Sequence, residues 1–189
     1  MNTQRLFGLL GMICSPLFLI YVLTTGMQES TLLGSTLGLL FQFGCLCCAI
    51  GLFAERATGD GVVGRTILFI QMTLHTLAMV FQVLEYKQIG LDSLLFTITD
   101  IAWPLGFLFM LVTGTAVIRA QRWLGWRRYL PLFCALPLPV TMLAGGLVGM
   151  EIGGYLFGLG LMVTYLLLGY AVFSYNQDET EMMVAQPTY

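Results

Sequence analysis

Two ionisable side chains lie deep within apolar stretches of this sequence. His75 occurs near the middle of the apolar run 66–84, and Asp100 occurs six residues into the run 94–118. An ionisable group at the centre of a bilayer costs at least about 2.5–3.5 kcal/mol on insertion scales, so such groups face a protein interior and find partners. A carboxylate beside an imidazole could hold a cationic ligand or act as an acid–base pair.

The run that contains His75 carries its polar residues on one side of a predicted helix. Their spacings of four, seven and three residues place them on a single helical face. They are Gln71, His75, Gln82 and Glu85. At ~1.5 Å of rise per residue, His75 lies about 14 Å from one end of its run and Asp100 about 9 Å from the opposite surface. We therefore expect these two side chains to lie at similar depth.

Three interpretations fit the candidate ligand-binding set, which comprises His75, Asp100, Gln71, Gln82, Glu85 and Trp103. In the first, the protein is a structural or assembly subunit, the third helix is a hydrogen-bonded spine, and Asp100 pairs with it or caps a kink. In the second, the groups line an outer-half cavity between the third and fourth helices and bind or transport a small polar or cationic ligand. In the third, His75 and Asp100 are the base and acid of an intramembrane enzyme that acts on a lipid or sterol.

Several membrane chemistries are excluded by residues that the sequence lacks. A single histidine cannot build a di-iron centre, a bis-histidine haem site or a zinc protease. The only lysine, Lys87, falls in a predicted loop, which excludes a retinal-type Schiff base within the helices. No G-x-S-x-G elbow, P-loop or dinucleotide fingerprint occurs. We therefore expect no metal and no cofactor.

The five cysteines all fall inside apolar runs, and we expect them to behave as small buried apolar side chains. They are Cys14, Cys45, Cys47, Cys48 and Cys134. A thiophilic metal on the segment 45–48 is a weaker alternative, because positions 45 and 48 share a helical face while position 47 points elsewhere.

One segment concentrates arginine and tryptophan. Its candidate headgroup-binding residues are Arg119, Arg122, Trp123, Trp126, Arg127 and Arg128. Tryptophan rings favour the depth of lipid headgroups, and guanidinium groups pair with anionic phosphate. We expect this segment to anchor the chain against membrane lipids, with a specific lipid or protein dock as the alternative.

The composition explains why these residues need a membrane-spanning scaffold. Of the 189 residues, 58% are hydrophobic and only 10% are charged, against roughly 25% charged in a typical soluble domain. The mean hydropathy is +0.86. These values indicate a membrane-embedded protein and exclude a basic nucleic-acid binder, a disordered chain and a disulfide-stapled secreted domain.

A membrane-crossing helix needs roughly 20 mainly apolar residues. The charges leave six such runs, at about 6–25, 32–54, 66–84, 94–118, 129–149 and 152–173. The sequence thus predicts an all-α, polytopic membrane protein in which residues 1–173 form one domain, a bundle of six transmembrane helices. Residues 174–189 form an acidic tail that we expect to be disordered and cytoplasmic.

The orientation follows from the arginines. If the N-terminus is cytoplasmic, seven of the eight basic residues lie in inner segments and only Lys87 lies outside. This bias predicts that the N-terminus and C-terminus are both cytoplasmic. The absence of an N-x-S/T sequon agrees with a bacterial inner membrane.

Glycine and proline bear on how the helices pack. Small residues allow helices to approach closely in lipid, and glycines at four-residue spacing occur at 34–38 and at 145–153. We expect packing within the chain, with a homo-oligomer through a glycine-rich face as the alternative. Pro16, Pro104 and the pair Pro137 and Pro139 should interrupt three spans. The segments 16–26 and 104–114 share five of eleven residues, which leaves open an inverted repeat of three plus three helices.

Overall fold

The computed structural model describes residues 3–26 and 31–175, and these residues form helices and no strand. The helices are α1 (Thr3–Cys14), α2 (Leu17–Thr25), α3 (Leu32–Ala54), α4 (Val62–Lys87), α5 (Leu94–Ala120), the short 3-10 helix η1 (Gly125–Tyr129), α6 (Leu130–Phe133), α7 (Pro137–Val148) and α8 (Met150–Phe173). The expected all-α fold is therefore confirmed. Most of the expected acidic tail lies outside the described residues.

Among the described residues, five helical segments are long and apolar enough to cross a membrane: α3, α4, α5, α8 and the pair α1 and α2 taken together. The segment from η1 to α7 makes a sixth only if it is counted as one span, since it bends by 52° between Phe133 and Pro137. The count is thus five or six, against the expected six. Helix α4 starts four residues earlier and ends three residues later than expected.

The prolines act differently at their separate positions. Pro16 separates α1 from α2, and the Met12 carbonyl four residues before it accepts a hydrogen bond from the Ser15 hydroxyl at 2.9 Å instead. Pro104, in contrast, lies within the continuous helix α5. The expected break at Pro104 is therefore wrong as an interruption of the helix, while the breaks at Pro16 and Pro137 are confirmed.

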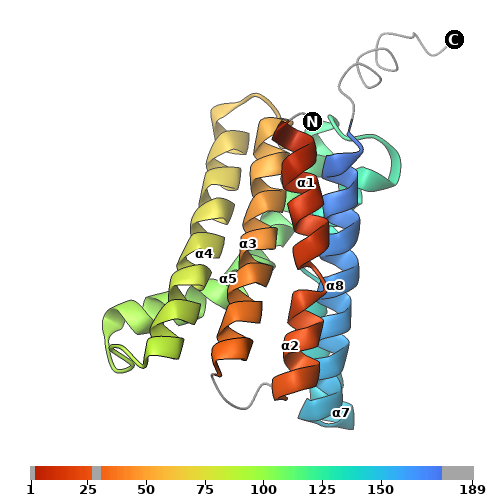
Figure 1. The fold of residues 1–189 in the computed structure, drawn as a ribbon. Helices are drawn as coiled ribbons and strands as arrows, with labels where there is room; N and C mark the ends of the chain where they lie inside the picture. The colour runs from red at the N-terminus through yellow and green to blue at the C-terminus, as the bar shows by residue number, and fades with distance from the viewer. Residues whose placement is uncertain (1–2, 27–30, 176–189) are drawn as a thin grey trace, which may run out of the picture.

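The helices follow one another around the bundle in the order α5, α4, α3, α1 with α2, α8 and α7 (Figure 1). The last helices of the chain return to α5 mainly through α6, which packs against α5. Helix α7 makes only slight contact with α5. Helix α1 begins and α8 ends at the same end of the bundle (Figure 1).

The two ends of the bundle differ in charge. We call the end where α1 begins and α8 ends the arginine-rich end. It carries Arg5, Arg56, Arg65, Arg119, Arg122, Arg127 and Arg128. We call the opposite end the acidic end, which carries Glu85, Asp92, Asp100 and Glu151 together with Lys87.

Close helix contacts are built on glycine within the chain. A Cβ atom at Gly8 would lie 2.4 Å from the backbone nitrogen of Phe173, so α1 and α8 could not approach this closely with any larger residue. The glycines of the 34–38 segment are also used inside the chain, Gly34 against Tyr21 and Gly38 against Gln82. Gly145 of α7 faces Gly153 of α8.

Candidate functional site

A hydrogen-bonded polar network lies at the centre of the bundle. Gln71 and His75 of α4 are buried, and the Gln71 side-chain nitrogen lies 2.9 Å from the His75 Nε2. The same amide nitrogen donates to the backbone oxygen of Gly106 in α5 at 2.9 Å. Thr113 of α5 donates to the Gln71 Oε1 at 3.1 Å, and the His75 Nδ1 lies 3.0 Å from the Oε1 of Gln42 in α3. The network therefore joins α3, α4 and α5.

These contacts define the protonation of the imidazole. The Gly106 carbonyl can only accept, so the Gln71 amide must direct its nitrogen toward it and toward the His75 Nε2. The Nε2 atom is then an acceptor, and the single ring proton resides on Nδ1 and is donated to Gln42. His75 is thus a neutral imidazole whose two nitrogens are both engaged. This arrangement suits a structural spine better than a base or a metal ligand.

The expected approach of Asp100 to His75 is not found. Asp100 is exposed, and the residue of α5 that lies level with His75 is Gly106. Six residues separate positions 100 and 106, which is about 9 Å along a helix. Because α4 continues to Lys87, about one turn beyond the expected end, His75 lies deeper than Asp100.

The remaining members of the expected ligand set are dispersed. Gln82 packs against Gly38 of α3, and Glu85 is half-buried in the last turn of α4. Trp103 is half-buried and lies on a different groove, described next. The structure therefore unites Gln71 and His75 but not the whole set around one cavity between α4 and α5.

A groove of about 620 Å³ opens at the acidic end of the bundle, among α2, α5, α7 and α8. It lies where α7 makes only slight contact with α5. Its lining is mostly apolar and aromatic: Val22, Gly26, Trp103, Leu138, Thr141, Met142, Gly145, Met150, Glu151, Gly153, Gly154, Tyr155 and Phe157. This cavity is in the half of the molecule where one was expected, but between different helices.

Aromatic rings and one carboxylate distinguish this groove. Trp103 of α5 and Phe157 of α8 are in edge contact, with ring centroids 5.8 Å apart and planes inclined at 69°. The buried ring of Phe107 packs against Trp103, with ring centroids 5.3 Å apart. Glu151 lies in the first turn of α8 and accepts a hydrogen bond from the Tyr155 hydroxyl at 3.3 Å. The groove can therefore offer ring surface and negative charge to the same ligand.

The arginine-rich end contains a buried carboxyl group that the sequence did not single out. Glu55 directly follows α3 and is 2% exposed, and the Trp123 Nε1 donates to its Oε2 at 2.9 Å. Its other oxygen, Oε1, is buried without a hydrogen-bond partner among the described residues. Burial raises the pKa of Glu55 to about 9, and the Trp123 bond and the Arg127 charge oppose this only in part.

The expected headgroup cluster divides into buried and exposed members. Trp123 is fully buried against Glu55 and Tyr175, so it is not available to headgroups. Trp126 is 50% exposed. Arg119 and Arg122 are exposed, and Arg122 pairs with Asp60, which also pairs with Arg56 at 2.9 Å. Arg127 and Arg128 are half-buried: Arg127 reaches the backbone oxygen of Ser174 at 3.5 Å and Arg128 reaches the Tyr129 hydroxyl at 2.7 Å.

All five cysteines are buried and none is in a disulfide. They fill helix contacts: Cys48 lies against Gly11, and Cys14 against Gly44. Within residues 3–26 and 31–175, no cluster of three histidine, cysteine or acidic side chains could hold a metal ion.

No protein-family model matches the chain, and neither does any curated protein or solved structure. Sequence reasoning missed Gln42 and Thr113, although an amide near the middle of an apolar run is itself a costly group that needs a partner. Glu55 and Glu151 gave no such indication, because each is simply a charged residue at the edge of an apolar run.

Proposed function

We propose that the protein binds a small organic cation in the groove at the acidic end, as a membrane-embedded binding or transport protein. The observation that carries this proposal is the pairing of the Trp103 and Phe157 rings with the Glu151 carboxylate around one cavity. Ring faces attract cations, most strongly in tryptophan, and a nearby carboxylate adds charge complementarity.

The size and lining of the groove support the same ligand class. Its volume of about 620 Å³ lies within the roughly 300–1,000 Å³ typical of small-molecule sites. Apolar side chains such as Met142 and Leu138 suit a hydrocarbon substituent, while anions are disfavoured because Lys87 is the only basic side chain at this end. The ligand is therefore a cation that also carries apolar groups.

The orientation adopted in this proposal follows the positive-inside rule. The arginine-rich end then faces the cytoplasm, and the groove opens on the outer side of a plasma membrane, such as a bacterial inner membrane. The central network of Gln42, Gln71, His75 and Thr113 serves as the rigid support for α5, and α5 carries Trp103.

A binding assay with the hydrophobic cation tetraphenylphosphonium tests the proposal. The purified protein in detergent should bind the radiolabelled probe saturably. Glu151→Gln should weaken binding about fivefold, because it removes a charge attraction worth ~1 kcal/mol. Trp103→Phe should weaken binding less than Trp103→Ala, because a phenylalanine ring keeps part of the cation–ring attraction.

Matched controls lie outside the groove. Asp92→Asn removes an exposed carboxylate from the same end, and Trp126→Ala removes an exposed tryptophan from the other end. Both should bind the probe like the unmodified protein. Probe binding that is not saturable, or that falls equally in Asp92→Asn and Glu151→Gln, contradicts the proposed site. Uptake of the probe into proteoliposomes, in excess of its passive entry into protein-free liposomes and lost in Glu151→Gln, then distinguishes transport from binding alone.

A further inference from the structure

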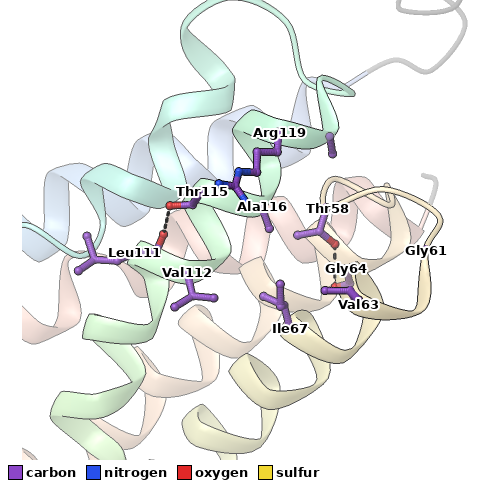
Figure 2. Close-up of a pocket in the computed structure, with 11 residues that line it drawn as sticks. Thr58, Gly61, Val63, Gly64, Ile67, Leu111, Val112, Thr115, Ala116 and Arg119 are labelled. Atoms are coloured by element: carbon purple, nitrogen blue, oxygen red, sulfur yellow. Dashed lines mark hydrogen bonds between the residues drawn. The ribbon is translucent and has the colours of Figure 1, made fainter.

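A second groove, of about 610 Å³, lies between α4 and α5 at the arginine-rich end. Figure 2 shows Val63 and Ile67 on one side, with Leu111, Val112 and Ala116 on the other. It occurs where the first turns of α4 face the last turns of α5. It shares no residue with the groove at the acidic end.

The walls of this groove offer hydrocarbon rather than hydrogen bonds. The Thr58 hydroxyl is already donated to the Gly64 backbone oxygen at 2.9 Å, and the Thr115 hydroxyl to the Leu111 backbone oxygen at 2.7 Å (Figure 2). Neither threonine hydroxyl is therefore free to donate a hydrogen bond to an occupant. A polar occupant would lose hydration along this surface without new partners, whereas an alkyl chain would not.

Positive charge gathers where the groove meets the arginine-rich end. Arg119 is exposed and lies beside Thr115 and Ala116 at one end of the groove (Figure 2). The ion pairs formed by the described residues join Asp60 to Arg56 and to Arg122, and none includes Arg119. Asp60 is thus shared by two arginines, and the guanidinium of Arg119 stays available for an anion at the membrane surface.

We propose that this groove binds one anionic phospholipid from the leaflet at the arginine-rich end. One acyl chain lies along the apolar walls between α4 and α5, and the headgroup phosphate pairs with Arg119. The charge complementarity is specific to a phosphate at the level of the helix ends, because guanidinium groups bind phosphate with two parallel hydrogen bonds. The apolar walls match the acyl chain of a lipid, and the Arg119 guanidinium matches its phosphate.

Gly61 provides a way to fill the groove without disturbing the fold. It lines the groove, its backbone angles of φ −69° and ψ 157° suit any residue, and a Cβ atom there would meet nothing within 4 Å. Gly61→Phe therefore adds a ring at the wall of the space assigned to the acyl chain. Gly146 of α7 is an exposed counterpart whose Cβ would also meet nothing within 4 Å, so Gly146→Phe is the matched control.

Native mass spectrometry from detergent micelles, doped with palmitoyl-oleoyl phosphatidylglycerol or the matching phosphatidylcholine, measures the proposed complex. The unmodified protein should retain one phosphatidylglycerol in preference to phosphatidylcholine. Arg119→Gln should lower the retained fraction about fivefold, the factor that corresponds to ~1 kcal/mol for one basic side chain at an anionic surface. Arg5→Gln, which removes an exposed arginine of α1 at the same end, should leave it unchanged.

Gly61→Phe should also lower phosphatidylglycerol retention while Gly146→Phe does not, which locates the chain in the groove independently of charge. Equal loss in Arg119→Gln and Arg5→Gln would mean diffuse attraction to the whole end and overturns the site. Displacement of the lipid by equimolar glycerol 3-phosphate would mean that the phosphate alone is bound, and it overturns the role of the groove. The thermal unfolding temperature of each variant, measured alongside, excludes loss of lipid through unfolding.

Discussion

Replacement of Glu55 by glutamine should remove a large pH dependence from the stability of the protein. Glu55 is buried where α3 ends, with one oxygen bonded to Trp123 and the other unpartnered among the described residues. Glutamine keeps an acceptor for the Trp123 N–H and cannot ionise. Burial is the main cause that raises the pKa of Glu55 from 4.5 to about 9.

The sign and size of the effect follow from this pKa. An acid whose pKa is higher in the folded state binds its proton more tightly there, so its contribution to stability is complete below pH 4.5 and is lost as the pH rises toward 9. Each pH unit in this window costs about 1.4 kcal/mol. The contribution of Glu55 alone should therefore make the free energy of unfolding about 4 kcal/mol lower at pH 7.5 than at pH 4.5.

Thermal unfolding in detergent, followed by intrinsic fluorescence between pH 4.5 and 9, measures this difference. The unfolding temperature of Glu55→Gln should exceed that of the unmodified protein by an amount that grows with pH. Asp60→Asn is the matched control, because Asp60 is an exposed acid of the same loop. If Glu55→Gln keeps the full pH slope of the unmodified protein, or if Asp60→Asn loses as much of it, the reasoning from burial is refuted.

Two further predictions concern the core of the bundle. Gln71→Leu should lower the free energy of unfolding by about 2 kcal/mol, because it removes three hydrogen bonds at ~0.6 kcal/mol each. Thr76→Val, on the exposed face of α4, should change the free energy of unfolding little. Unfolding by sodium dodecyl sulfate measures both variants, and equal midpoints would contradict the structural role of the network. Gly8→Ala should cost about 1–3 kcal/mol, because its Cβ would lie 2.4 Å from the Phe173 backbone nitrogen, while Gly146→Ala, with open space around it, should cost nothing; a tolerated Gly8→Ala would argue against the close contact of α1 and α8.

Particular residues show how far the sequence could predict the site. The polar face of α4 was predicted correctly at Gln71 and His75, because periodicity along one helix places side chains relative to that helix. The expectation that Asp100 lies at the depth of His75 was wrong. His75 bonds to Gln42 and Gln71 and not to Asp100, because the relative shift of α4 and α5 depends on where each helix ends and how the two pack.

Trp123 and Trp103 show the same limit. Both are tryptophans near arginine or acidic residues in the sequence. Trp123 is nevertheless fully buried against Glu55, whereas Trp103 borders a groove that it shares with α2, α7 and α8, which are distant from it in the sequence. The aromatic residue type predicts that a ring is partly apolar and partly polar. It does not predict which of several neighbouring surfaces will cover it.

The sequence alone determined that this protein is helical and membrane-embedded, and it determined the approximate position of each apolar run and the opposite charge of its two ends. These properties depend on the length of each hydrophobic run and on the positions of the charges, and both can be read directly from the order of the residues. Only the tertiary structure decided that His75 is an engaged neutral imidazole, that Glu55 is buried, and that the grooves lie among α2, α5, α7 and α8 and between α4 and α5. In lipid, helix register and tilt come from close packing at small residues such as Gly8 and Gly38, and that packing involves pairs of helices that no single periodicity can specify.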